Sequence, residues 1–363
     1  MRQCFYLAQK GQTSPNPKVG CVIVKDNKIM ASGFHLKAGS PHAELDAIEK
    51  VSGELQGATL YTNLEPCCHT NKRTPPCAQR IISEGITKVV ISNLDPNPLV
   101  AGAGVELLKK AGIEVISGIL SDEGEELNEI FFKNMRFNKA FIHLKIAQSL
   151  DGKIATQIGD SQWISNEKSR EKVHKWRQDY DCVLIGAGTL RQDNPKLTAR
   201  LENSIQCPWR VVLSRSGNLP IQRELFQDEF SHKTIVAIAQ DQLDVRAELI
   251  SELEKQSVHV IPVKLKDNNL DLEVLLDELY SFGVRSVLVE GGQKVFTSFI
   301  EQKQYDRISF FIAPKIIGKG IDSVGDLSQS LIHQSLELQN VKMDLIDNNF
   351  FVSGKGSHLC LQD

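Results

Sequence analysis

Long apolar segments are missing from this chain of 363 residues. No uninterrupted apolar run approaches the roughly 18 residues that a membrane-spanning helix needs. The N-terminal residues contain neither a long apolar core nor a small-residue cleavage site, so they do not resemble a secretion signal. We therefore expect a soluble, cytoplasmic protein that has no membrane partner.

A large excess of charge of either sign is also absent. The chain has 42 Lys and Arg against 45 Asp and Glu, which gives a formal net charge of -3. This balance argues against a broad basic surface, and we expect no nucleic-acid partner. Hydrophobic residues make up 41% and charged residues 24%, which excludes a largely disordered chain. At roughly 150 residues per domain, the length predicts about two domains.

Cysteine is too sparse to form a disulfide scaffold, because only eight cysteines are spread over the whole chain. Three of them, Cys67, Cys68 and Cys77, nevertheless lie within eleven residues. Such clustering in a chain without a secretion signal is more typical of a metal site than of disulfides.

Strand and helix patterns alternate along the chain, which predicts sheets covered by helices on both faces. In the first part we expect strands at 19–24, 59–64, 89–92 and 113–117, and helices at 42–50, 75–84, 104–111 and 121–137. In the second part we expect strands from 141 and at 182–186, 210–213, 234–239, 258–263, 287–290 and 308–312, and helices at 166–178, 244–255, 272–282 and 294–302. The chain should end in a hairpin that turns at Asn348 and Asn349. We place the domain boundary between residues 137 and 138, which gives domains 1–137 and 138–363.

The first part contains a pattern typical of a catalytic metal site. His42 and Glu44 are followed by Cys67 and Cys77. One imidazole and two thiolates suit Zn²⁺, with the fourth tetrahedral position open to water. Zinc lowers the pKa of its water to about 7. Glu44 stands two residues from His42, close enough to exchange a proton with that water as general acid and base.

Simpler interpretations of each piece exist. A lone H-x-E is common on helix surfaces, and a Pro-Cys-Cys stretch can be buried thiols. A closed structural zinc site that uses Cys68 or His69 as a fourth ligand is the sharper alternative. The three pieces in this order match the zinc deaminase signature, which favours the catalytic site. The prolines before His42 and Cys77 place both ligands in the first turn of helices, where the helix dipole favours a thiolate.

The second part lacks the G-x-G-x-x-G fingerprint of dinucleotide-binding folds. A strand that ends in Glu290 is followed instead by Gly291, Gly292 and a helix. Two glycines let the backbone approach a pyrophosphate, and the N-terminus of the helix supplies donors. From this feature alone, a tight strand-to-helix turn is the simpler interpretation.

Longer motifs resemble the bifunctional deaminase–reductase family of riboflavin biosynthesis. In the first part they cover residues 16–24, 39–44, 64–69, 73–77, 95–98 and 100–104, and in the second part 144–147, 149–153, 159–165, 189–195, 197–200 and 289–292. The match extends over nearly the whole chain. It implies an α/β protein with an N-terminal cytidine-deaminase-like, three-layer α/β/α domain followed by a dihydrofolate-reductase-like α/β domain. One departure is the spacing from Cys67 to Cys77, which is one residue longer than in the family and should bulge the surface loop at 69–73.

The resemblance also implies roles for individual residues. His42, Cys67 and Cys77 would bind Zn²⁺, Glu44 would move protons, and Asn16 would orient the substrate of the deaminase. The residues that would contact NADPH are Ala147, Trp163, Thr189, Asp193, Gly292, Gln293, Lys294, Val295, Phe296, Thr297 and Ser298. The residues that would hold the substrate of the reductase are Ser161, Arg177, Leu197, Arg200 and Glu290.

Several of these residues have plainer explanations. Asn16 between two prolines could be a turn residue, and Asp193 before Asn-Pro could be another. Arg177 could be a solvated charge on a helix, although an arginine suits a substrate phosphate. Trp163 could be a core residue. Arg215, after the strand at 210–213, is a candidate for binding the 2′-phosphate of NADPH because of its charge and place.

The expected activity is two consecutive steps on one small-molecule substrate, a phosphoribosylaminopyrimidine. The first is the hydrolytic deamination of 2,5-diamino-6-(5-phosphoribosylamino)pyrimidin-4-one. The second is the NADPH-dependent reduction of the ribosyl group of 5-amino-6-(5-phosphoribosylamino)uracil to ribityl. The family also implies a homo-oligomer, a dimer or a tetramer. Two rival hypotheses are a nucleic-acid base deaminase with a binding domain behind it, and a zinc-stabilised regulator whose sites have decayed.

Overall fold

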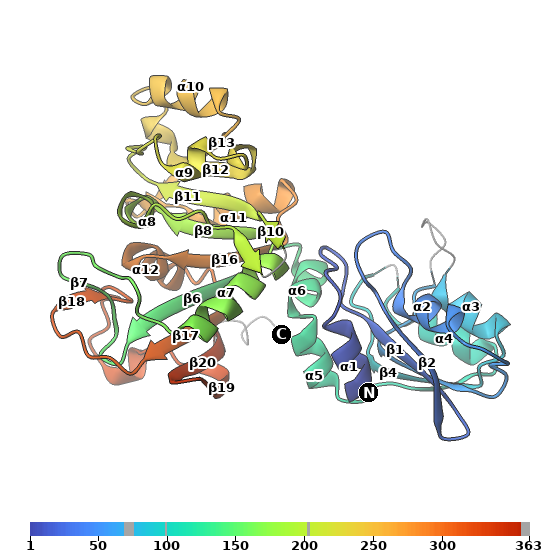
Figure 1. Ribbon diagram of the computed structural model, residues 1–363. Coiled ribbons are helices and arrows are strands. Elements are labelled where there is room, and N and C mark those ends of the chain that lie inside the picture. Colours follow the sequence, from blue (N-terminus) through green and yellow to red (C-terminus); the bar gives the residue numbers. More distant parts are fainter. Residues whose placement is uncertain (69–75, 99, 202–203, 357–363) are drawn as a thin grey trace. The chain divides into compact units, whose positions relative to one another are not determined.

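The computed structural model describes residues 1–68, 76–98, 100–201 and 204–356 (Figure 1). The chain divides into two compact units, Met1–Asn138 and Lys139–Asp363, which we call unit 1 and unit 2. Each contains its own sheet and its own apolar core. Among the helices of the described residues, none is long and apolar enough to cross a membrane.

Unit 1 is built on a five-stranded sheet in the order β2-β1-β3-β4-β5. β1 is antiparallel to β2 and β3, whereas β3, β4 and β5 are parallel. The strands are β1 (Gly20–Lys25), β2 (Lys28–Phe34), β3 (Thr59–Leu64), β4 (Lys88–Asn93) and β5 (Glu114–Ile116). The helices are α1 (Arg2–Ala8), α2 (Ala43–Glu49), α3 (Cys77–Ser83), α4 (Ala103–Lys110), α5 (Ser121–Leu127) and α6 (Glu129–Phe137). Strands and helices lie where they were expected except in the segment 121–137, and β2 is a strand that the sequence patterns did not predict.

The side chains of β1 alternate between the two faces of this sheet, as strand geometry requires. Cys21 and Ile23 pack in the larger core with residues of α2, α3 and α4. Val22 faces the other way, against Cys4 and Leu7 of α1. Figure 1 shows α5 and α6 beside α1, so unit 1 has three layers, α/β/α.

The single helix expected at 121–137 is wrong, because the chain forms two helices that are interrupted at Asn128. The side chain of Asn128 is buried and bonded to the backbone of Lys18 at both ends. Its Oδ1 accepts from the N–H of Lys18 (2.8 Å), and its Nδ2 donates to the Lys18 carbonyl (2.9 Å). The helical pattern of the sequence at 121–137 does not reveal this contact between Asn128 and Lys18.

Unit 2 is built on a nine-stranded sheet in the order β13-β12-β11-β8-β16-β6-β17-β20-β19. The seven strands from β13 to β17 in this order are parallel, and β20 and β19 are antiparallel. The strands of this sheet are β6 (Phe141–Ser149), β8 (Cys182–Gly186), β11 (Trp209–Ser214), β12 (Thr234–Ala239), β13 (His259–Val263), β16 (Ser286–Gly291), β17 (Arg307–Ala313), β19 (Leu338–Ile346) and β20 (Asn349–Gly356). Three small two-stranded sheets are formed by β7 (Lys153–Thr156) with β18 (Gly320–Asp322), β9 (Ala199–Leu201) with β10 (Ser204–Gln206), and β14 (Leu265–Lys266) with β15 (Asn269–Leu270).

Helices cover both faces of the large sheet. The α-helices are α7 (Glu167–Asp179), α8 (Ala187–Asp193), α9 (Glu224–Gln227), α10 (Ala247–Lys255), α11 (Leu272–Ser281) and α12 (Gln293–Glu301), and the short 3-10 helices are η1 (Ser231–Lys233), η2 (Gln240–Gln242) and η3 (Ile332–Gln334). α11 and α12 pack on one face with Leu144, Leu184 and Val211. α8, α9 and α10 pack on the other face with Val183 and Val212. The helix expected from residue 244 begins at Ala247.

The C-terminal hairpin is present, but its turn lies one residue earlier than expected. Ile346 pairs with Asn349, so Asp347 and Asn348 form the turn. Asn349 belongs to the strand, and its buried side chain forms hydrogen bonds with another element. Its Oδ1 accepts from the backbone N–H of Asn166 (2.7 Å) and from the hydroxyl of Ser169 (3.2 Å) at the start of α7.

Candidate active sites

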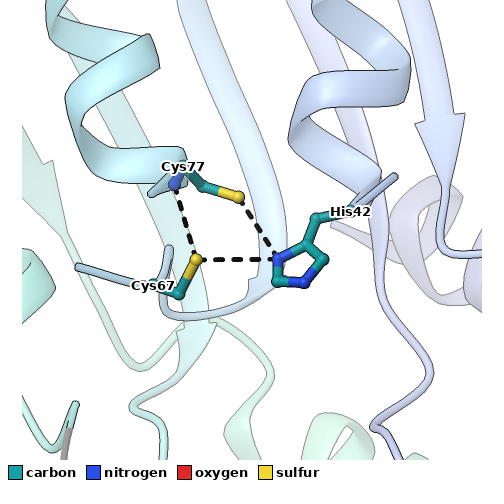
Figure 2. A group of neighbouring side chains, drawn as sticks. All are labelled: His42, Cys67 and Cys77. Atoms are coloured by element: carbon teal, nitrogen blue, oxygen red, sulfur yellow. Dashed lines mark hydrogen bonds between the residues drawn. The ribbon is translucent and has the colours of Figure 1, made fainter. Parts of the chain in front are cut away.

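Three side chains from separate elements of unit 1 meet in one place (Figure 2). His42 immediately precedes α2, Cys67 follows β3, and Cys77 is the first residue of α3. Their donor atoms all lie within 4.8 Å of one another. The Nδ1 atom of His42 is 3.6 Å from the sulfur of Cys67 and 3.4 Å from the sulfur of Cys77. The expected metal ligands are therefore brought together.

The local backbone prepares these groups to bind a cation. Both thiols are buried, and the backbone N–H of Cys77 donates to the sulfur of Cys67 (3.4 Å). This donor and the dipole of α3 both favour a thiolate. His42 occupies the N-cap position of α2 rather than its first turn, contrary to expectation. Its extended backbone conformation turns the imidazole toward the two sulfurs.

The alternative of a closed structural site receives no support from Cys68. Among the described residues, the group that could hold a metal ion contains His42, Cys67 and Cys77, and Cys68 is not part of it. Cys68 instead packs against the apolar core of unit 1. His69 and the longer loop at 69–73 lie outside the described residues.

Glu44 lies in the first turn of α2, two residues after His42, and only 3% of it is exposed. Burial raises the pKa of its carboxyl above the ordinary value, and the nearby His42 imidazole acts in the opposite direction. A raised pKa brings a carboxyl closer to the working pH of a general acid and base. Glu44 is therefore suited to take up and return a proton beside the metal ligands.

The loop that carries Cys67 is fastened by a second buried carboxylate, that of Glu65. It accepts hydrogen bonds from the backbone N–H groups of Asp95 (3.1 Å), Gly102 (3.0 Å) and Val105 (3.1 Å). These donors belong to the loop after β4 and to the start of α4. The contacts connect the ends of two neighbouring parallel strands, which is where open α/β sheets place their sites.

Asn16 is fixed by a histidine that carries no motif and that sequence reasoning missed. His35 is buried, and its Nδ1 must donate to the carbonyl of Pro41 (3.0 Å). Its Nε2 is then free to accept from the amide nitrogen of Asn16 (3.2 Å). The imidazole of His35 also packs edge-on against that of His42, with centroids 5.5 Å apart. This chain of contacts connects Asn16 to the metal ligands. Asn16 also forms a turn with Thr13, as its interpretation as a turn residue predicts, whereas its role toward a substrate stays a prediction.

Unit 2 contains a cavity of about 1490 Å³. The expected NADPH contacts that line it are Ala147, Trp163, Thr189, Asp193, Gly292, Gln293, Lys294, Val295, Phe296 and Ser298. The expected substrate contacts that line it are Ser161, Arg177, Leu197, Arg200 and Glu290. Thr297, which was also expected to contact NADPH, is not among the residues that line this cavity. Its hydroxyl donates to the carbonyl of Gln293 (2.8 Å) and accepts from the N–H of Gly325 (2.8 Å).

The two glycines where β16 leads into α12 stand at positions that a larger residue would occupy only with strain or a steric clash. Gly292 has a φ of 80°, in the region that favours glycine. A Cβ on Gly291 would lie 2.7 Å from the Cα of Ile185, so a larger residue would push β16 away from β8. At the N-terminus of α12 the cavity is therefore lined by glycines, so that a ligand can approach the backbone closely. This arrangement suits an anionic ligand such as a pyrophosphate.

Arg177 and Glu290 form a two-pronged ion pair at the wall of this cavity. Nε and Nη2 of Arg177 donate to the two carboxylate oxygens at 2.6 and 2.8 Å. Only 13% and 7% of the two side chains are exposed, so the interpretation of Arg177 as a solvated charge is wrong. Burial raises the pKa of Glu290, but Arg177 and then Lys145 outweigh it, and the pKa is lowered overall. Lys145 lies 3.9 Å from the same carboxylate and is a further cavity residue that the sequence reasoning did not assign.

The other expected residues are placed as follows. Trp163 is 63% exposed, so the alternative of a core residue is wrong. Asp193 accepts a hydrogen bond from the hydroxyl of Ser161 (3.3 Å). Arg215 lines the cavity and donates to the side chain of Asn268.

Comparison with known proteins agrees with these two sites. Residues 1–93 match the family described as the cytidine and deoxycytidylate deaminase zinc-binding region, and residues 140–352 match the RibD C-terminal domain. The riboflavin biosynthesis protein RibD of Aquifex aeolicus is 40% identical over 97% of this chain and 96% of its own. RibD of Escherichia coli is 35% identical over 88% of each chain.

Solved structures give the same result. A structure of RibD from Acinetobacter baumannii superposes with a TM-score of 0.84 at 34% identity, covering 98% of this chain and 97% of the other. A diaminohydroxyphosphoribosylaminopyrimidine deaminase/5-amino-6-(5-phosphoribosylamino)uracil reductase from Thermotoga maritima superposes with a TM-score of 0.82 at 40% identity, with the same coverage. These matches confirm the expected fold class. The chain belongs to the RibD family of bifunctional deaminase–reductases of riboflavin biosynthesis.

Proposed function

We propose that residues 1–137 deaminate 2,5-diamino-6-(5-phosphoribosylamino)pyrimidin-4-one, and that residues 138–363 reduce the resulting 5-amino-6-(5-phosphoribosylamino)uracil with NADPH. The observation that carries the proposal is the meeting of His42, Cys67 and Cys77 beside the buried Glu44. A separate cavity with an arginine–glutamate pair supports the second activity.

The donor set fits zinc. One imidazole nitrogen and two sulfurs within 4.8 Å of one another leave a fourth position for water. Zinc bound there supplies hydroxide at neutral pH and so a nucleophile for the ring carbon. Glu44 would accept one proton of the water and deliver it to a ring nitrogen, and it would then carry the proton of the added hydroxyl to the amine, which departs as ammonia. Its burial keeps it out of bulk water, so the proton stays in the site.

Asn16 would orient the pyrimidine ring. Because its amide nitrogen is engaged by His35, its carbonyl oxygen is the end available to a substrate N–H. A fixed amide of this kind costs little entropy when the substrate binds, which favours a productive orientation.

The cavity of unit 2 fits NADPH and a phosphorylated substrate together. NADPH supplies the hydride, and the glycine turn before α12 would receive its pyrophosphate. Among the residues that line the cavity, Lys145, Arg177 and Arg200 lie near Glu290, and within this group of four the positive charges exceed the negative charge by two. That excess matches a phosphate monoester, which carries nearly two negative charges at pH 7.

A coupled assay tests the two activities together. The assay contains purified protein, the diaminopyrimidine substrate and NADPH. It should yield ammonia and NADP+ in equal amounts. Ammonia without NADPH consumption would overturn the bifunctional assignment. Ammonia release from RNA, and none from the free pyrimidine nucleotide, would support the rival nucleic-acid deaminase. Neither product, with zinc bound, would support the regulator.

The expected homo-oligomer and cytoplasmic location belong to the same proposal. β19 is an edge strand of the large sheet, and β19 and β20 expose Val341, Met343, Leu345 and Phe350. An exposed apolar row at a sheet edge is a common contact between copies of a chain. Met343→Lys should shift the sedimentation coefficient toward that of a monomer, whereas an unchanged coefficient would exclude this surface.

A further inference from the structure

We propose that His174 is a positioning residue of the reductase, which holds Arg200 at the phosphate end of the substrate cavity. The inference rests on the proposed function, because that function assigns Arg200 to the substrate. It adds a residue that the motifs of the sequence do not include. His174 lies on α7 and lines the cavity together with Arg177, which stands one turn further along the same helix.

The contact that carries the inference is a hydrogen bond. The backbone N–H of Arg200 donates to Nδ1 of His174 at 3.2 Å. A backbone N–H only donates, so Nδ1 of the imidazole has no proton and the neutral ring carries its proton on Nε2. The bond therefore requires a neutral histidine, because an imidazolium has no nitrogen that accepts.

The surroundings of His174 keep it neutral. Burial, together with the charges of Arg177 and Arg200, lowers the pKa of His174 to about 4. Glu290 and the backbone of Thr198 act in the opposite direction but do not outweigh these effects. At neutral pH the ring therefore accepts the N–H of Arg200 and adds no charge of its own.

His174 completes a two-point attachment of the segment that carries Arg200. Arg177 donates from Nη1 to the carbonyl of Thr198 (3.1 Å), and His174 accepts from the N–H of Arg200 two residues later. The guanidinium of Arg200 then reaches the hydroxyl of Thr198 (3.2 Å). Without His174 this segment would lose one of these two hydrogen bonds to α7, and the backbone N–H of Arg200 would lose its acceptor.

The effect is measured on the KM values of the reductase. His174→Leu removes the acceptor, and we expect the KM for the deaminated substrate to rise about tenfold, as for one lost hydrogen bond. The KM for NADPH and the rate of ammonia release should stay within about twofold. His174→Asn should restore the KM, because its Oδ1 stands where Nδ1 stood. Lys175→Ala, an exposed neighbour on α7, is the matched control.

A double-mutant cycle decides whether His174 acts through Arg200. Arg200→Ala should raise the same KM, and adding His174→Leu should then change it by less than about twofold. A tenfold effect of His174→Leu that persists in the Arg200→Ala background would overturn the inference. So would an unchanged KM in His174→Leu, or a KM in folded His174→Asn as high as in the leucine variant. An unchanged KM in Arg200→Ala would instead overturn the assignment of Arg200 to the substrate.

Discussion

Arg177 of α7 and Glu290 of β16 are joined by two short hydrogen bonds, at 2.6 and 2.8 Å, across 113 residues of sequence. The pair fastens α7 to the strand that leads into the glycine turn. It also sets the charge of the cavity wall, since each partner neutralises the other. Loss of one partner has a different consequence from loss of both.

Arg177→Ala removes the two-pronged partner of the buried carboxylate of Glu290, from which Lys145 lies 3.9 Å away. Breaking a buried pair in this way costs about 3 kcal/mol of unfolding free energy. We expect a lower denaturation midpoint for unit 2 and a reductase KM that rises by at least tenfold. Chemical denaturation and steady-state kinetics measure the two effects. The double variant Arg177→Met with Glu290→Gln should recover stability but not activity, and exposed Lys255→Ala should change neither.

Glu44→Gln replaces the proposed proton carrier with a group of the same shape. We expect ammonia release to fall by at least about 100-fold, because general acid–base catalysis contributes that much or more. One zinc per chain should remain, since the proposed ligands are His42, Cys67 and Cys77. Metal analysis and an ammonia assay check this, with NADPH oxidation on the deaminated substrate as the internal control. Loss of zinc would mean that Glu44 is itself a ligand.

His143 makes the stability of unit 2 depend on pH. It is buried between the hydroxyls of Tyr180 and Ser309, both at 2.7 Å. Burial, together with the charges of Arg307 and Lys172, lowers its pKa to about 3. Between its ordinary pKa of about 6.5 and this value, the unfolded chain binds a proton that the folded chain does not. Stability should therefore fall as the pH decreases from 6.5 toward 3, by about 1.4 kcal/mol per pH unit from this residue.

Chemical denaturation of the wild type and of His143→Gln at several pH values tests this slope. Glutamine keeps a donor and an acceptor but does not titrate, so its stability should depend less steeply on pH. The same slope in both proteins would assign the pH dependence to other groups. The pKa of His174 is also lowered, so this residue likewise makes the stability fall as the pH decreases. It is present in both proteins and does not affect the comparison.

Arg215→Ala tests the site expected for the 2′-phosphate of NADPH. Arg215 lines the cavity after β11 and is in contact with Asn268. Removal of a charge-assisted contact to the phosphate should lower the preference for NADPH over NADH about tenfold. The ratio of kcat/KM for the two cofactors is the measurement. An unchanged ratio would assign Arg215 to the contact with Asn268 alone.

The sequence by itself determined most of the deaminase site. H-x-E and the two cysteines predicted the ligands, since zinc accepts few donor types and these stand at fixed places relative to helices and strand ends. Short continuous apolar runs likewise predicted the strands of the parallel sheet, because strands that are buried on both faces are apolar along their whole length.

Tertiary structure decided the contacts between segments distant in sequence. Asn128, at which the helix is interrupted, is hydrogen-bonded to the backbone of Lys18. Asn349, which belongs to a strand, accepts a hydrogen bond from the backbone of Asn166 at the start of α7. The hydrogen bonds between His35 and Asn16 and between Arg200 and His174 are likewise encoded by no local pattern. A polar side chain satisfies its bonds with whatever the fold brings near it, so its role follows from the packed chain rather than from its neighbours in sequence.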